Sequence, residues 1–314
     1  MPLPATATAV TPLIPPTAPA ATPNGGTRLA RVNRELDHER RQGVLREIVI
    51  PPCPERLVRL RQAISAPEPD LAVVSRIAAS DVAMAATLIR NANSALHAVG
   101  PPVRTVGQAM DRLGLNQTAA LMTGFLARHA IPVNHPRLTR FWQRATLRAA
   151  ALALIARRLP GLSPDLAYTC GLFCHVGIPV LLQSLRGYGG TLVEAEARID
   201  RPFVATENAN HRTDHAVVGA LVARAWQLAP AAVVAIRLHH DFASLGAGGI
   251  EAEVHTLVAA GLVAEHLMRR REGLGAESEW LAHGADALRW LQVDADDVDD
   301  WHEALQDSLD AEFA

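Results

Sequence analysis

The stretch from Asp165 to Gln183 reads DLAYTCGLFCHVGIPVLLQ, a long apolar segment near the middle of the chain. Its apolar character predicts a helix buried in a core. The stretch carries Cys170, Cys174 and His175 where most core helices carry leucine. Free cysteine packs in cores as a small apolar residue. The adjacent imidazole therefore raises the question of whether this helix carries, or has lost, a chemical site.

The composition favours a helical protein. The chain has 314 residues, of which 49% are hydrophobic but only 4% aromatic. Such a core must be built from Ala, Leu, Val and Ile, and Ala and Leu are strong helix formers. We therefore predict an all-α protein.

Charge and cysteine content limit the partners and the compartment. The formal net charge is −2, so no global basic field attracts nucleic acid or anionic lipid. No apolar run reaches the roughly 20 residues that span a bilayer. The odd number of cysteines, three, favours a reducing compartment over a disulfide framework. We expect a cytoplasmic protein with no nucleic-acid partner and no membrane.

Changes in sequence pattern divide the chain into four parts. Residues 1–28 are rich in Pro, Ala and Thr, which predicts a disordered tail. Residues 29–47 predict a flanking helix, and residues 48–271 form the central domain, divided into lobes 48–135 and 136–271. Residues 272–314 predict a C-terminal helical extension.

Helix signals in the central domain are strong, with two exceptions. Asp70, either Ser80 or Asp81, and Thr105 are placed to cap helices. Gly114 is expected to end one helix before another runs to about Ala130. Residues 187–190 are expected to interrupt the helices of the second lobe, and residues 201–212 to form a loop.

Two linked segments of the first lobe carry a family resemblance. Ser80–Leu96 reads SDVAMAATLIRNANSAL, and Val103–Leu115 reads VRTVGQAMDRLGL. In this order they resemble the two helices of the HD-related output domain, HDOD. HAVVGALVARAWQL, which starts at His215, and AIRLHHD, which ends at Asp241, are similar to later segments of that family. The resemblance implies that an HDOD domain covers residues 48–271 as two packed helical lobes, of which the second is HD-like.

The second lobe resembles a metal enzyme that has lost its ligands. Gly171–Gly177 reads GLFCHVG, which resembles the Gly-Leu-Leu-His-Asp-Ile-Gly of HD phosphohydrolases, where the His-Asp pair ligates catalytic metal. The family's ligand positions fall here on Arg144, Cys174, His175, His215, His239, His240 and Gly261. A guanidinium cannot ligate a cation, and no carboxylate stands at any of these positions. The resemblance thus implies no bound metal, no cofactor and no catalytic residue.

A zinc site is the alternative at the central helix. Cys170 and Cys174 share a helix face, and two thiolates with His215 or His239 would make a tetrahedral set. Structural zinc sites usually present their cysteines on a turn rather than inside a helix, so packed thiols are the preferred interpretation. For His239 and His240 we expect one ring to pack or bond to backbone and the other to face solvent.

Four polar residues are candidates for binding a partner or ligand. They are Asn91, Asn93, Ser94 and Asp214. The alternative is that they cap the ends of helices and bind nothing.

The expected function follows from the resemblance. It implies a non-catalytic bacterial signal-transduction protein that acts by binding a signalling protein, with a nucleotide as a possible ligand. We expect the contact surface where the two lobes meet. The alternative is a divergent metal-dependent HD phosphohydrolase that acts on a nucleotide.

Overall fold

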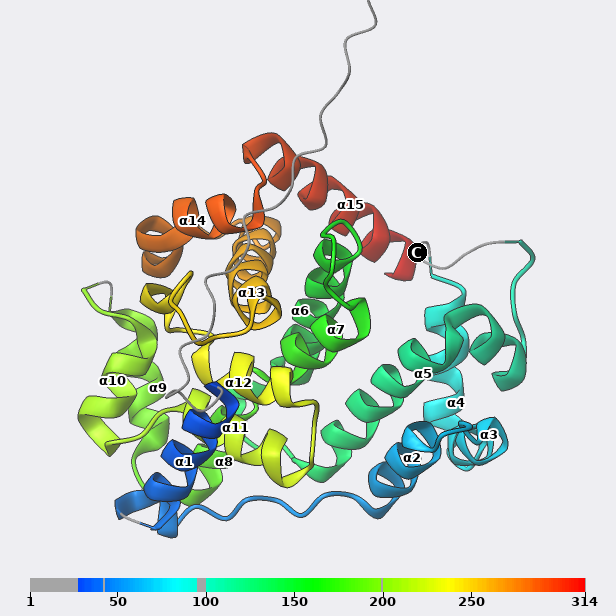
Figure 1. Cartoon of the computed structure of the whole chain (residues 1–314), viewed down its shortest axis with the longest axis horizontal. Coiled ribbons are helices and arrows are strands. Elements are labelled where there is room, and N and C mark those ends of the chain that lie inside the picture. The colour runs from blue at the N-terminus through cyan, green and yellow to red at the C-terminus, as the bar shows by residue number, and fades with distance from the viewer. Residues whose placement is uncertain (1–27, 42, 95–99, 199, 314) are drawn as a thin grey trace, which may run out of the picture.

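A computed structural model describes residues 28–41, 43–94, 100–198 and 200–313, and every regular element in these ranges is helical (Figure 1). The predicted all-α class with two lobes is confirmed. Residues 1–27 of the predicted tail lie outside the described residues, and Arg28 is the first residue of a helix. The predicted domain boundaries stay predictions.

The first lobe is a group of four packed helices at the lower right of Figure 1. They are α2 (Glu55–Ser65), α3 (Leu71–Ala79), α4 (Val82–Ala92) and α5 (Val106–Ala130). Asp70, Asp81 and Thr105 cap α3, α4 and α5 through their side-chain oxygens, as predicted. Gly114, at φ 77°, bends α5 where the sequence predicted a helix end.

The second lobe is built around the central stretch, which is not one continuous helix. The stretch forms α7 (Pro164–Phe173), a turn at 174–176, and α8 (Gly177–Ser184). The surrounding elements are η2 (Pro136–Leu138), α6 (Phe141–Ala156), α9 (Tyr188–Ala197), α10 (Phe203–His211), α11 (His215–Ala225), α12 (Pro230–Leu238), η3 (Phe242–Ser244) and α13 (Ala252–Arg271).

Two sequence expectations for the second lobe are wrong. Residues 203–211 of the expected loop form α10, because Thr206 and Glu207 are buried in the fold. The expected break at residues 187–190 lies instead at residues 185–187, because Gly187, at φ 81°, precedes the start of α9 at Tyr188.

Helices α6 and α7 form the centre of the lobe. A Cβ atom on Gly171 would lie 2.9 Å from the Cα of Ala149, so the backbones touch and only glycine fits there. One hydrophobic core joins both lobes. Trp226 is fully buried between them, packing edge-on against Phe173, and its indole N–H donates to the Pro51 carbonyl at 2.9 Å.

The flanking helices cover the second lobe. Helix α1 (Arg28–Arg41) lies against α11 and α12, with Arg237 paired to Glu35. Helices α14 (Ser278–Leu291) and α15 (Ala295–Phe313), coloured orange to red in Figure 1, pack on α13.

We expected no segment long and apolar enough to cross a membrane. By the criteria of length and composition alone, this expectation is wrong. Pro164–Ser184 meets both criteria, and the bent pair Leu71–Ala79 with Val82–Ala92 meets them together. Of the residues in the apolar window of Pro164–Ser184, 67% are buried inside the fold. The core helices of folded domains have this same character.

A stacked histidine attaches α14 to α13. The ring of His266 lies parallel to the indole of Trp280 of α14, with 3.8 Å between centroids and 5° between planes. Burial and the nearby Arg270 lower the pKa of His266 to about 4.

Acid should weaken this contact. The unfolded chain holds His266 near its ordinary pKa of about 6.5, so stability present at neutral pH falls as pH drops from 6.5 toward 4. Because the ring is partly exposed, we expect a loss of only about 1 kcal/mol. Urea unfolding of wild type and His266→Phe at pH 7 and 4.5 measures it. The phenyl ring keeps the stack without titrating, so an unchanged pH dependence in this variant would contradict the assignment.

Candidate functional site

Four histidines converge from three places in the second lobe. His175 lies in the turn between α7 and α8, His215 is the first residue of α11, and His239 and His240 follow the end of α12. One ring nitrogen of each lies within 4.8 Å of those of the other three. The family resemblance placed each of these histidines at a ligand position of the HD enzymes, but it did not predict that the four form one cluster.

Three of the rings are oriented by acceptors on their outer side. His215 Nδ1 lies 2.7 Å from Glu207 Oε2, His239 Nδ1 lies 2.7 Å from the Ile236 carbonyl, and His240 Nδ1 lies 2.7 Å from Glu279 Oε1. Their Nε2 atoms therefore point inward. His215 Nε2 lies 3.3 Å from His239 Nε2 and 3.1 Å from His240 Nε2.

The expectation that one ring of the His239-His240 pair faces solvent is wrong. His239 does bond to backbone, as expected, but the side chain of His240 is only 14% exposed. Glu279 covers it. This carboxylate comes from α14, in the C-terminal extension, so no pattern near His240 in the sequence points to it.

Glycine sets the close contact that brings His175 to His215. A Cβ on Gly177 would lie 2.1 Å from the carbonyl oxygen of His215 and 2.9 Å from the nitrogen of Gly219. Helix α8 therefore begins directly against the first turn of α11. The glycine at the end of the GLFCHVG motif thus has a packing reason.

A buried carboxylate supports His215 from behind. Glu207 is fully buried and accepts from the Tyr188 hydroxyl, from the His215 ring and from the His215 backbone N–H. Sequence reasoning missed Glu207 because it placed this segment in a loop. Burial opposes charge on His215, but the Glu207 carboxylate raises the pKa of the imidazole above its ordinary value.

The neighbouring rings are held neutral. Burial, followed by the nearby Arg148, places the pKa of His175 well below its ordinary value. Burial, followed by the adjacent His240, does the same for the pKa of His239. Neutral imidazoles are the form that ligates a metal.

The position of the family's first histidine ligand is occupied by an ion-pair network. Arg144 pairs with Glu272 at 2.6 Å and with Glu265 at 3.3 Å, and Arg148 pairs with Glu265 at 2.9 Å. The Glu265 and Arg148 side chains are 18% and 7% exposed. Glu265, one turn after Gly261, is thus engaged by two guanidinium groups. A Cβ at Gly261 would meet open space, so nothing there substitutes for the missing aspartate.

The cysteines do not join the histidines. Within the part of the chain that the structure describes, the four histidines are the one group of three or more potential ligands. Cys174 is buried and its thiol donates to the Gly171 carbonyl at 3.4 Å. Burial raises the pKa of both Cys170 and Cys174, so both are protonated thiols. This geometry favours packed cysteines over the alternative zinc set.

The polar residues proposed for binding have partners in their own backbone. Asn91 donates to the Thr87 carbonyl, and the Ser94 hydroxyl donates to the Asn91 carbonyl. Asp214 caps α11 through the Val217 N–H and also accepts from Asn208. These bonds favour the capping alternative, and the binding role stays a prediction.

Asn93 holds the chain on both sides of residues 95–99. Its side-chain amide donates to the Val103 carbonyl at 2.9 Å and accepts from the Val103 N–H at 2.8 Å. Asn93→Ala would leave both buried groups of Val103 unpaired, which should cost about 1–3 kcal/mol. Denaturant unfolding measures this loss. Asn91→Ala is the control and should change stability by less than about 0.5 kcal/mol; equal effects would contradict the role of Asn93.

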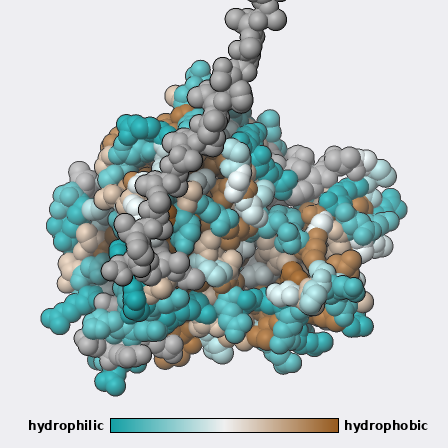
Figure 2. Space-filling model, in the orientation of Figure 1, coloured by the Kyte–Doolittle hydropathy of each residue, from teal (hydrophilic) through white to brown (hydrophobic). Residues whose placement is uncertain are grey.

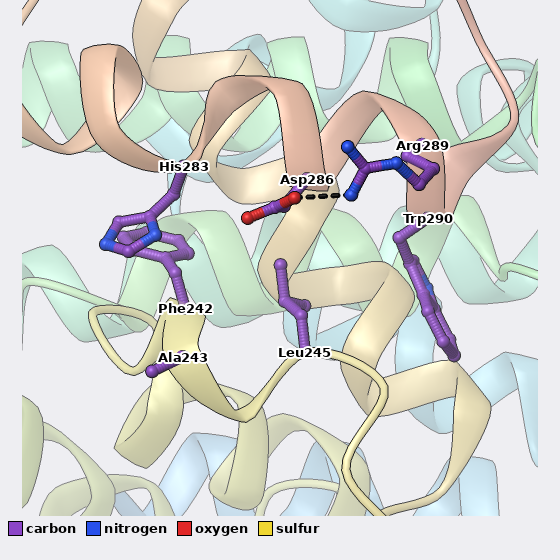
Figure 3. A pocket seen from close by; sticks show the side chains of 7 residues that line it. All are labelled: Phe242, Ala243, Leu245, His283, Asp286, Arg289 and Trp290. Atoms are coloured by element: carbon purple, nitrogen blue, oxygen red, sulfur yellow. Dashed lines mark hydrogen bonds and ion pairs between the residues drawn. The ribbon is translucent and has the colours of Figure 1, made fainter.

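One pocket lies apart from the histidines. It has a volume of about 480 Å³ between the η3 segment and α14, and no histidine of the cluster lines it. Figure 3 shows Phe242 against His283 on one side, Trp290 on the other and the paired Asp286 and Arg289 above Leu245.

The chain belongs to the class of all-helical proteins with an HD-like lobe, and sequence comparison identifies the family. The HDOD domain profile matches residues 50–242, which is more than half of the chain. This protein is a member of the HDOD family, and the predicted recognition is confirmed.

Solved structures agree with this fold. A candidate signal transduction protein from Marinobacter aquaeolei VT8 is 21% identical with a TM-score of 0.67, over 91% of this chain and 65% of that one. A candidate phosphohydrolase from Shewanella amazonensis SB2B is 20% identical with a TM-score of 0.62, over 88% and 93%. An HDOD protein of unknown function from Geobacter sulfurreducens is 22% identical with a TM-score of 0.57, over 80% of each chain.

A relative by sequence is an uncharacterized protein of Treponema pallidum, 25% identical over 194 residues. The match covers 61% of this chain but only 38% of that protein. This chain therefore spans well under two thirds of the length of this relative, and just under two thirds of the Marinobacter chain.

Proposed function

We propose that this protein is a regulatory HDOD protein that acts by binding a signalling partner and does not hydrolyse phosphoesters. The observation that carries the proposal is the fate of the ligand positions around the histidines. HD-type hydrolysis needs carboxylates beside imidazoles to hold hard divalent ions. Here the nearby Glu265 is bound by Arg144 and Arg148, and Cys174 is a buried thiol.

A contact surface on the first lobe supports the proposal. Val58 and Val82 are 40% and 86% exposed, and Leu71 is 55% exposed. The Arg56–Asp81 ion pair holds the start of α2 beside the start of α4. Figure 2 shows hydrophobic surface at the lower right of the view, where this lobe lies. Exposed apolar surface of this kind often marks a protein-binding site.

The same surface continues into the junction of the lobes. A groove of about 270 Å³ is lined by Val58, Arg61 and Gln62 of α2 and by residues 225–227 at the end of α11. Arg61 donates across it to the Trp226 carbonyl. We call Val58, Val82 and this groove the lobe surface, and propose that the partner binds there.

Hydrolysis assays test the catalytic half of the proposal. Chromogenic phosphodiester and phosphomonoester substrates are incubated with the full chain and with Mn²⁺, Mg²⁺, Zn²⁺ or Co²⁺. We expect the rate to equal that of a His240→Ala variant. Metal-dependent turnover that this variant lacks would contradict the proposal.

Crosslinking in cells tests the binding half. Val82→Asp and Val58→Asp place charge on the lobe surface and should abolish the partner crosslink while leaving the melting temperature unchanged. Val193→Asp, on a residue that is 41% exposed in the second lobe, is the matched control. Loss of the crosslink in the control alone would place the contact elsewhere.

The second candidate is a divergent phosphohydrolase. The histidine cluster and the Shewanella structure named as a candidate phosphohydrolase favour it. The hydrolysis assay separates it from the first proposal.

A further inference from the structure

The orientation of the histidines indicates what lies between them. A backbone carbonyl or a carboxylate can only accept, so the Nδ1 atoms that face Glu207, Ile236 and Glu279 carry the protons. A neutral imidazole with its proton on Nδ1 carries a bare lone pair on Nε2. Those lone pairs face each other at 3.1 and 3.3 Å. Such an arrangement is repulsive unless a cation lies between the rings.

The spacing fits a metal ion. Zinc–imidazole bonds of about 2.0–2.1 Å in a tetrahedron separate neighbouring nitrogens by about 3.4 Å. The observed separations between Nε2 atoms are close to that edge length. The ring centroid of His175 lies 5.0 Å from that of His215 and 5.1 Å from that of His239, which places it as the fourth ligand.

The surrounding charges balance a dication. Glu207 and Glu279 lie directly behind His215 and His240 and supply two negative charges. Arg148, the nearby cation, is paired with Glu265. The competing occupant is a proton on His215, shared with His239 and His240. A single proton shared by these three rings would not bind the lone pair of His175. A tetrahedral metal ion would bind all four rings.

We propose that His175, His215, His239 and His240 bind one borderline transition-metal dication, best matched by Zn²⁺, and that Glu279 of α14 is a positioning residue for it. Imidazole suits zinc and its neighbours, whereas Mg²⁺ and Mn²⁺ prefer oxygen ligands. Four protein ligands close the site and leave no position for a reacting water. This proposal corrects the sequence-based expectation of no metal, and it does not depend on the lobe surface.

Helix α14 contributes Glu279 to the same site. Glu279 lies outside residues 50–242 that match the family profile, yet both of its oxygens lie within 2.9 Å of His240 Nδ1. A carboxylate behind a ligating histidine fixes its ring and raises its basicity. Metal bound at the cluster would therefore also stabilise α14 on the second lobe.

Cobalt titration of the full chain tests the proposal. The protein is stripped with a chelator and titrated with Co²⁺, whose visible absorption reports tetrahedral nitrogen coordination, and elemental analysis gives the stoichiometry. We expect one ion per chain, displaced by one equivalent of Zn²⁺ and not by a thousandfold excess of Mg²⁺ or Mn²⁺. His240→Ala should lose the signal, and His129→Ala, which removes an exposed histidine outside the cluster, should keep it.

Variants of Glu279 test the positioning role. Glu279→Ala should weaken Co²⁺ binding about 10–100-fold. Glu279→Gln keeps an oxygen that can accept from Nδ1–H and should restore part of the affinity. No tetrahedral signal in wild type at neutral pH would mean that a proton alone holds the cluster, and would overturn the proposal. Unchanged affinity in Glu279→Ala would overturn the role of α14. Hydrolysis by the zinc-loaded protein would instead count against the regulatory function and leave the metal site intact.

Discussion

Replacing Gly177 with alanine is expected to destabilise the protein by about 3 kcal/mol or more, at the upper end for overpacking a core. The new Cβ would lie 2.1 Å from the His215 carbonyl oxygen, 2.8 Å from its carbon and 2.9 Å from the Gly219 nitrogen. All three atoms belong to the α11 backbone, so no rotamer change relieves the clash and α8 must move away. Denaturant unfolding of the full chain measures the loss.

Gly190→Ala is the matched control. Gly190 lies in α9, and a Cβ there meets no atom within 4 Å beyond its own helix and its neighbours. Alanine is favoured over glycine in a helix by about 0.5–1 kcal/mol, so this variant should be as stable as wild type or more stable. If Gly177→Ala behaved in the same way, the close approach of α8 to α11 would be wrong.

Replacing Arg148 with methionine should cost about 3 kcal/mol. The Arg148 side chain is 7% exposed, and its removal leaves Glu265 with only the longer 3.3 Å pair to Arg144. Breaking one side of a buried ion pair typically costs about 3–5 kcal/mol, because the remaining charge stays desolvated. The Arg144 contact should keep the loss at the lower end, and unfolding in urea measures it.

Two further variants define the mechanism. Arg148→Met combined with Glu265→Leu should recover most of the stability, since an apolar pair can replace a buried ion pair at little cost. Arg198→Met removes two surface ion pairs, to Glu194 and Asp200, in which every partner is more than a third exposed, and should change stability by less than about 1 kcal/mol. Equal losses in Arg148→Met and Arg198→Met would contradict the buried network.

The fold was predictable where local signals are strong. Asp81 and Thr105 cap helices because their short side chains reach backbone N–H groups, and Gly114 bends α5 because it can adopt a positive φ. The prediction of a loop at α10 was wrong because the polar residues of this segment are typical of loops. The fold instead buries Glu207 against Tyr188 and His215, and that burial depends on tertiary contacts that no local pattern contains.

The candidate site was predictable only in part. The family resemblance marked His175, His215, His239 and His240 one by one. It did not show that they form a cluster, because they come from three helix ends up to 65 residues apart in the sequence. Whether a histidine is a ligand depends on the direction of its Nε2 atom, and Glu207, Ile236 and Glu279 set that direction. Glu279, in the C-terminal extension, had no sequence signal.

X-ray absorption at the zinc edge of the zinc-loaded full chain tests the central claim most directly, namely that this pocket has kept imidazoles and lost carboxylate ligands. We predict a shell of four nitrogens at about 2.0–2.1 Å and imidazole scattering beyond it. A second metal at about 3.5–4 Å, as in two-metal phosphoesterases, or zinc that fails to bind after loading, would contradict it.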